Sequence, residues 1–239
     1  MEVFFVLVAF IFGLVFGSFY NVVIYRLPKG LSLVKPGSSC PNCGHHLSPR
    51  ELIPVLSYLF QKGRCRACGE PIAWRYPIVE LGTGLGFAFI AFRSFNWTEL
   101  FVGLVFFSLL LVLALIDLDH KLLPNVLTLP GVVIGLVFAL LGWNLPFWSS
   151  VLGALVGFLV MFVIALISRG GMGMGDAKLM AMIGAFLGWK KVFFVLFWAS
   201  VFGSIGGILF LYFTKQDRKT PIPFGPCLAV AAFVYYFLT

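Results

Sequence analysis

Acidic residues at the ends of long apolar runs are the first candidates for chemistry in this sequence. Asp117 and Asp119 end one apolar run, Asp176 follows the glycine-rich segment 170–175, and Glu80 lies near the start of another run. An acid at bilayer depth costs about 2.5–3.5 kcal/mol on insertion scales. If the apolar runs cross a membrane, these acids therefore indicate a functional site.

Asp117 and Asp176 are the pair whose placement suggests a reaction. Alternation of the expected membrane spans brings both to one side of the membrane, from helices that are not adjacent in sequence. Two carboxylates held close in low dielectric do not both ionise, so one keeps a proton while the other acts as a base toward water. This chemistry hydrolyses a peptide without a metal or a covalent nucleophile. From spacing alone, Asp176 as a helix N-cap and Asp117 with Asp119 as a solvated span end remain open alternatives.

The lengths of the apolar runs predict how deep each aspartate lies. The run that ends at Asp117 begins near Glu99 and reaches about 27 Å, which places Asp117 at the interface. The run after Asp176, up to Trp189, reaches only about 20 Å against a hydrocarbon core of about 30 Å. We therefore expect Asp176 to be recessed below the membrane surface, where glycine-rich backbone lines a cavity or is buried in protein.

Four of the five cysteines are spaced as a metal site. They form two Cys-x-x-Cys pairs separated by 21 residues: Cys40, Cys43, Cys65 and Cys68. Such pairs wrap four thiolates tetrahedrally around one Zn²⁺, and a closed four-cysteine site leaves no position for water, so we expect a structural metal. Disulfides or free thiols are the alternative, but a reducing cytoplasm disfavours disulfides. His45 and His46 are interpreted as surface loop residues and Cys227 as an apolar packing residue.

The elements that must position these residues are predicted by composition and hydropathy. The chain of 239 residues is 61% hydrophobic and 11% charged, with a mean hydropathy of +1.03, against about 45–50% and about 25% in ordinary soluble domains. This excludes a soluble enzyme and predicts an all-α polytopic membrane protein of about eight transmembrane helices. The expected spans are 3–25, 77–96, 100–117, 124–142, 147–168, 177–189, 192–213 and 222–238.

The polar stretch 26–76 is the one candidate domain outside the membrane. We expect a first transmembrane helix over 1–25, a cytoplasmic zinc-binding domain over 26–76, and a membrane core of about seven helices over 77–239. A domain of this size buries too little apolar surface to be stable through its own core, and a bound metal supplies the additional stability. No internal repeat is evident in the sequence.

The basic residues predict the topology. With residues 26–76 in the cytoplasm, 14 of the 17 Lys and Arg lie on the cytoplasmic side, and only Arg93, Lys190 and Lys191 lie outside. The positive-inside rule therefore places both termini outside. A basic cytoplasmic face also attracts anionic lipid headgroups, so the net charge of +8 requires no nucleic acid as a partner.

Five ordered motifs resemble those of the type IV prepilin peptidases, aspartic proteases of the bacterial inner membrane. They are the Gly-Met-Gly-Asp segment that ends at Asp176 together with Asp117, the paired cysteines, and the segments 16–28, 54–59 and 75–80. The resemblance covers nearly the whole chain and implies a multi-pass protein of the inner membrane. It also implies that Asp117 and Asp176 are the catalytic aspartates and that Asp119 is a neighbour outside the pair.

The resemblance further implies two activities. The first is cleavage of a basic leader from prepilins or pseudopilins at the cytoplasmic face, after a glycine. The second is methylation of the new amino terminus, usually phenylalanine, with S-adenosylmethionine as the methyl donor. No nucleotide-binding glycine motif is present, so the residues suggested for the donor are Gly17, Ser18, Asn21 and Glu80. Tight helix packing through small residues is the alternative for them, with Glu80 paired to Arg26 or Arg75.

Three other functions remain as alternatives at this stage. One is a peptidase without methyltransferase activity. Another is an ion-coupled membrane transporter, in which the acids relay protons or bind cations. The third is a membrane anchor for a zinc-binding module, in which both aspartates are dispensable.

Overall fold

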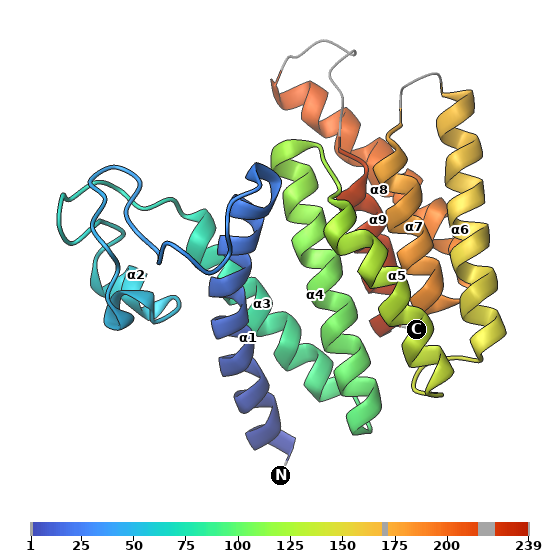
Figure 1. The fold of residues 1–239 in the computed structure, drawn as a ribbon, viewed down its shortest axis with the longest axis horizontal. Helices are drawn as coiled ribbons and strands as arrows, with labels where there is room; N and C mark the ends of the chain where they lie inside the picture. Colours follow the sequence, from blue (N-terminus) through green and yellow to red (C-terminus); the bar gives the residue numbers. More distant parts are fainter. Residues whose placement is uncertain (1, 169–171, 215–222, 239) are drawn as a thin grey trace. The chain divides into compact units, whose positions relative to one another are not determined.

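The fold of the chain was obtained as a computed structural model that describes residues 2–168, 172–214 and 223–238 (Figure 1). Within these residues the regular structure is helical, and pairing between extended segments is limited to two isolated bridges, Ser39 with His46 and Arg64 with Pro71. This confirms the all-helical class predicted from the hydropathy. The chain divides into two compact units, Met1–Phe95 and Asn96–Thr239.

The first unit is built on two long helices that pack along each other. These are α1 (Glu2–Arg26) and α3 (Arg75–Arg93), and the chain between them contains η1 (Leu27–Lys29), η2 (Pro49–Leu52) and the short α2 (Leu56–Phe60). Glycine permits the close packing, since a Cβ on Gly17 would lie 2.7 Å from the Cα of Glu80. The compact unit Met1–Phe95 contains α3 together with α1. The division into 1–25, 26–76 and 77–239 stays a prediction.

The second unit is a bundle arranged around one short helix. It comprises α4 (Trp97–His120), α5 (Asn125–Leu140), α6 (Phe147–Ile167), α7 (Met174–Leu187), α8 (Trp189–Thr214) and α9 (Gly225–Leu238). The central α7 packs against α5, α6, α8 and α9, as Figure 1 shows for α5 and α6 on its two sides. Every residue of α7 is buried except Met174, Gly175 and Lys178, so this helix forms the core of the unit.

Small residues bring α6 and α7 into direct backbone contact. A Cβ on Gly184 of α7 would clash with the carbonyl oxygen of Gly153 in α6, and a Cβ on Gly153 would clash with that of Gly184. One turn away, the buried Ser150 hydroxyl donates a 2.6 Å hydrogen bond to the carbonyl of Ala185. This contact fixes the height of α7, which carries Asp176, against α6.

A helix lies at each of the eight segments expected to span the membrane. Four helices of the described chain are long and apolar enough to cross a bilayer: Val3–Lys29, Trp97–His120, Phe147–Ile167 and Trp189–Ile208. Asn125–Leu140 and Gly225–Phe237 are shorter apolar helices. The positions of the predicted helices are therefore confirmed, and the passage of all eight through the membrane stays a prediction.

Candidate active site and metal centre

Asp117 is a buried acid in the last turn of α4. It is 5% exposed. The helix ends at His120, and the left-handed backbone of the C-cap residue Lys121 (φ 52°) allows its N–H to donate to the carbonyl of Asp117 at 2.8 Å. The side-chain Oδ2 accepts a 2.9 Å hydrogen bond from the backbone N–H of Gly225, the first residue of α9. The first N–H groups of a helix have no partner within the helix, and Asp117 satisfies one of them. Asp117 is therefore not a solvated span end.

Asp176 is a second buried acid, at the third position of α7. It is 8% exposed. The residue at the N-cap position of α7 is Gly173, in an extended conformation. Asp176 is therefore inside the first turn of the helix and does not occupy the N-cap position that was its alternative interpretation.

Two side-chain contacts hold the segment after Asp117 against the segment that contains Asp176. Buried Leu123 packs on Gly175, where a Cβ would lie only 2.9 Å from the Cβ of Leu123. The ammonium of Lys178 donates a 2.7 Å hydrogen bond to Oδ1 of Asn125. The segment after Asp117 and the start of α7, which carries Asp176, are thus in contact.

Asp119 and Gly225 are neighbours of the two aspartates, one exposed and the other in contact with Asp117. Asp119, two residues after Asp117, is exposed at the end of α4. Gly225 was not singled out from the sequence, although its N–H contacts Asp117. The available signal was Gly225 itself, followed by Pro226, immediately before the last apolar run, because proline favours the first turn of a helix.

The four predicted metal ligands gather in the first unit. Their sulfur atoms all lie within 4.8 Å of one another, with Cys40 Sγ 3.9 Å from Cys68 Sγ and Cys43 Sγ 4.0 Å from Cys65 Sγ. Four thiolates at about 2.3 Å from a tetrahedral Zn²⁺ are about 3.8 Å apart. The four cysteines, all free of disulfides, therefore fit a tetrahedral metal.

Each cysteine pair is held by its own backbone turn, and the two turns are of the same type. The N–H of Cys40 donates to the carbonyl of His45 at 2.9 Å, and the N–H of Cys65 donates to that of Glu70 at 2.8 Å. Gly44 and Gly69 take the same left-handed conformation, with φ of 71° and 73°. The segments 40–47 and 65–72 are thus a short repeat of the form Cys-x-x-Cys-Gly, which corrects the expectation that the chain has no internal repeat.

Glu51 stabilises the first cysteine turn through contacts with His45 and Ser48. Nε2 of His45 lies 3.4 Å from Oε2 of Glu51, and the N–H and hydroxyl of Ser48 donate to the same oxygen at 2.9 and 2.7 Å. These hydrogen bonds from Ser48, backbone first, lower the pKa of Glu51 to about 2. Glu51 is therefore ionised at neutral pH and closes the turn of η2 as a capping box.

The four residues suggested for the methyl donor lie along the contact between α1 and α3. Gly17 packs against the backbone of Glu80. The amide of Asn21 donates to the carbonyl of Tyr76 at 3.1 Å, and Glu80 accepts a 2.7 Å hydrogen bond from the N–H of Val55. Gly17, Asn21 and Glu80 thus serve the packing of the first unit.

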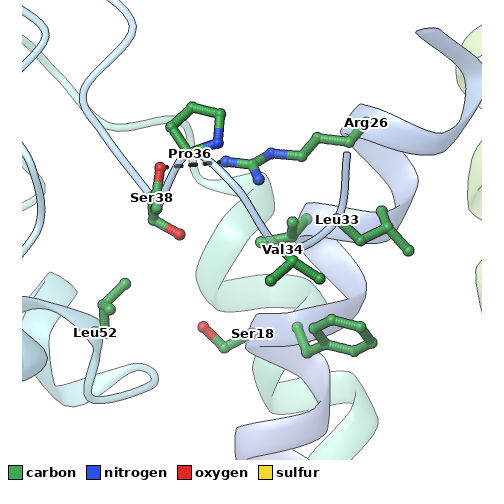
Figure 2. A pocket seen from close by; sticks show the side chains of 10 residues that line it. Ser18, Arg26, Leu33, Val34, Pro36, Ser38 and Leu52 are labelled. Carbon is green, nitrogen blue, oxygen red and sulfur yellow. Dashed lines mark hydrogen bonds between the residues drawn. The ribbon is translucent and has the colours of Figure 1, made fainter. Parts of the chain in front are cut away.

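Ser18 is the member of that set that lines a cavity. The cavity has a volume of about 240 Å³, and Figure 2 shows it between α1, with Ser18 and Arg26, and the following loop. The guanidinium of Arg26 shapes this loop by donating to the carbonyls of Ser32 at 3.0 Å and Gly37 at 3.2 Å. Ligand pockets measure about 300–1,000 Å³, and the described residues that line this cavity include no carboxylate for a cation. The lining of this cavity thus supplies no negative charge for a cation.

Comparisons with known proteins cover both units. Residues 11–94 match the Bacterial Peptidase A24 N-terminal domain, and residues 104–208 match the Type IV leader peptidase family. The second match contains both Asp117 and Asp176. No solved structure gives a significant match to this chain.

Relatives named prepilin leader peptidase/N-methyltransferase align with nearly the whole chain. The protein of Myxococcus xanthus is 48% identical over 87% of this chain and 63% of the relative, so the chain spans less than two thirds of that protein. The proteins of Bacillus subtilis and Pseudomonas aeruginosa are 40% and 39% identical, each over 96% of this chain and over 92% and 89% of their own lengths. With this identity and coverage, and with the family match over α4 to α8, the chain belongs to the type IV leader peptidase family.

Proposed function

We propose that the chain removes the basic leader of type IV prepilins or pseudopilins by aspartate-catalysed hydrolysis, with Asp117 and Asp176 as the catalytic residues. Membership in the leader peptidase family supports the activity and the substrate class. The observation that carries the residue assignment is the burial of two acids, Asp117 in α4 and Asp176 in α7, on segments that contact each other within one unit. Membership in a peptidase family also favours hydrolysis over the ion-coupled transport alternative.

The reaction follows from the shared low-dielectric environment of the two acids. One carboxyl retains a proton, and the ionised one removes a proton from water. The oxygen of that water forms a bond to the scissile carbonyl carbon, while the protonated carboxyl donates to the carbonyl oxygen. Collapse of the tetrahedral intermediate breaks the C–N bond, and the leaving nitrogen takes the proton. Because Oδ2 of Asp117 is held by Gly225, we assign its Oδ1 to the water.

Methylation of the new amino terminus is the second activity that we propose. The names of the relatives support it, and S-adenosylmethionine would supply the methyl group when bound. The assignment of Gly17, Ser18, Asn21 and Glu80 to the donor stays a prediction, and we derive no step through it. A labelled methyl donor, incubated with cleaved prepilin, separates this activity from that of a peptidase alone.

The four cysteines are proposed to hold a structural Zn²⁺ within a cytoplasmic domain over 26–76. The closed set of four thiolates and the matched sulfur spacing support this assignment. The charge distribution supports eight membrane crossings in the bacterial inner membrane, with residues 1–25 as the first and 77–239 as the core. Anionic lipid is then the expected neighbour of the basic face.

Leader cleavage by conservative variants tests the catalytic assignment. Asp117→Asn and Asp176→Asn, purified and reconstituted in liposomes with a prepilin, are expected to lose about 10²- to 10⁴-fold in cleavage rate. Asparagine keeps an oxygen that accepts from Gly225, so Asp117→Asn retains the contact with α9. Asp119→Asn is the matched control, because Asp119 is exposed two residues away. Normal turnover by either Asp117 or Asp176 variant overturns the assignment.

A further inference from the structure

The segment 52–61 of the first unit is uncharged and presents large apolar side chains on its surface. It contains the short helix α2 and lies between Glu51 and Lys62. The exposed side chains, which we call the α2 patch, are those of Leu52, Ile53, Leu56, Leu59 and Phe60. Phe60 is 84% exposed and Leu59 is 62% exposed. Apolar side chains gathered in this way mark a surface that another molecule covers.

The start of α2 is attached to the two long helices well before the end of α1. The N–H of Val55, which immediately precedes α2, donates a 2.7 Å hydrogen bond to Oε2 of buried Glu80 in α3. The backbone of Glu80 packs in turn on Gly17 of α1. Gly17 lies nine positions before Arg26, the last residue of α1, which is about 13 Å at 1.5 Å per residue. Figure 1 shows α2 level with the middle part of α1 and not beyond its end.

This attachment sets the depth of α2 if α1 crosses the membrane. Val3–Lys29 is long and apolar enough to do so, and α1 carries no charged side chain between Glu2 and Arg26. A hydrocarbon core of about 30 Å takes up about 20 helical residues. Wherever the core begins after Glu2, Gly17 lies at least about 8 Å inside its cytoplasmic edge. The contact through Glu80 therefore places the start of α2 within the cytoplasmic leaflet.

The backbone around α2 is suited to an environment without water. Nonhelical backbone is tolerated at membrane depth only where its polar groups are satisfied. Carbonyls within residues 53–57 accept hydrogen bonds of 2.6 to 3.1 Å from the N–H groups of Leu56, Ser57, Leu59 and Gln61. Glu80 serves the N–H of Val55, and the buried Tyr58 donates its hydroxyl to the carbonyl of Ile72 at 3.3 Å. These polar groups are thus paired inside the first unit.

The surroundings of the α2 patch match a lipid monolayer. Exposed basic residues flank segment 52–61 on both sides: Arg50, Lys62, Arg64 and Arg66. Bases next to an apolar insertion lie at the level of anionic headgroups. Trp74, whose ring lies 5.3 Å from that of Tyr58, is 71% exposed, and tryptophan favours the membrane interface. At the height of Gly17, α1 also exposes Phe16 and Phe19, so two elements of this unit offer apolar surface at one depth.

We propose that the α2 patch is inserted among the acyl chains of the cytoplasmic leaflet, as a loop that enters the membrane without crossing it. The inference rests on the proposed crossing by α1 and not on the peptidase chemistry. It divides the polar stretch 26–76, because the cysteine turns stay in water while segment 52–61 lies in lipid. The proposed zinc site is then held at a fixed height on the membrane surface.

The experiment measures the depth of the α2 patch in the full chain, reconstituted in nanodiscs of phosphatidylethanolamine and phosphatidylglycerol. Phe60 is replaced by p-trifluoromethylphenylalanine, which keeps the aromatic ring and adds a fluorine probe. The same probe at Val15 of α1, 56% exposed, is the reference in the bilayer. The probe at the exposed Ala67, in the second cysteine turn, is the reference in water. Each ¹⁹F resonance is recorded with lipids that carry a nitroxide on the acyl chain and, separately, with a gadolinium chelate in the buffer.

The acyl-chain nitroxide is expected to broaden the resonances at positions 60 and 15 beyond detection and to spare the one at 67, and the chelate is expected to do the reverse. A probe at 60 that responds as the probe at 67 overturns the insertion. A probe at 60 that is shielded from both agents also overturns it and assigns the α2 patch to a protein partner, a second copy or a bound substrate. If the chain labelled at 60 does not fold, the probe at Leu59 is read in the same way.

Failure of the other proposals has different signatures. Broadening of the resonance at Val15 by the chelate would exclude the crossing by α1, and the insertion with it. Full cleavage by Asp117→Asn or Asp176→Asn would overturn the catalytic assignment alone, because the fluorine probes measure depth and not activity.

Discussion

The backbone N–H of Gly225 donates a 2.9 Å hydrogen bond to Oδ2 of Asp117, and 108 positions of sequence separate the two residues. This contact joins the end of α4 to the start of α9. It also fixes the rotamer of one proposed catalytic acid, because a carboxylate that accepts a backbone hydrogen bond is held in orientation.

Gly225→Ala is expected to disturb the acid directly. An added Cβ would lie 2.6 Å from Oδ2 and 3.1 Å from the carboxyl carbon of Asp117, so the carboxylate must shift. A misplacement of about 1 Å costs about 100-fold in rate, and we expect a loss of that order in leader cleavage. Gly206→Ala, with open space around its Cβ, serves as the control. Wild-type kinetics in Gly225→Ala would show that the contact does not position Asp117.

Gly175→Ala is expected to push the start of α7, which carries Asp176, away from the segment that follows Asp117. Its Cβ would lie 2.9 Å from the Cβ of Leu123, and overpacking of this kind costs about 1–3 kcal/mol of unfolding free energy. Both thermal stability and cleavage should fall. Leu123→Gly in the same chain removes the opposing Cβ and should restore part of the cleavage rate. A double variant no better than the single one would argue against a direct clash.

Cys65→Ser is expected to abolish stoichiometric metal binding. Three thiolates and a hydroxyl do not complete the closed tetrahedral site, and metal ligation and folding are coupled in so small a domain. Elemental analysis should find one Zn²⁺ per wild-type chain and much less in the variant, and hydrogen exchange should lose protection over 26–76. Cys227→Ser, which removes the cysteine outside the cluster, should keep its metal. Retained protection after chelation would contradict a metal-dependent fold.

Glu51→Gln is expected to weaken the first cysteine turn in a pH-dependent way. Since the folded pKa is about 2 and the unfolded value is about 4.3, the ionised group stabilises the fold at higher pH. The stability difference between wild type and variant should be constant from pH 7 to about 4.5 and should narrow as the pH falls toward 2. Hydrogen exchange of residues 45–52 measures it. A difference independent of pH over this range would exclude ionisation as its source.

The sequence predicted the helices well, because each arises from a local run of apolar residues. The choice of Asp117 and Asp176 as the catalytic pair stays a prediction; both stand where apolar runs meet polar or glycine-rich segments. Hydropathy does not report which helices share a core. For this reason the division of the chain after Phe95, with α3 beside α1, required the packing itself.

The parts that escaped prediction depend on contacts distant in sequence. Helix packing was the alternative interpretation of Gly17, Asn21 and Glu80, and their particular contacts become visible only once α1 lies against α3. The contact of Gly225 with Asp117 likewise requires the whole second unit. The repeat of the two cysteine turns was legible in the sequence, and the matched glycines after each pair were its signal.

The burial of α7 separates this helix from changes in the thickness of the surrounding bilayer. A helix exposed to acyl chains adjusts its tilt when the hydrocarbon thickness changes. In α7, every residue except Met174, Gly175 and Lys178 is enclosed by protein, and Gly153 and Gly184 lock its height against α6. Asp176 should therefore keep its depth in thin and thick bilayers alike, while the outer helices absorb the mismatch.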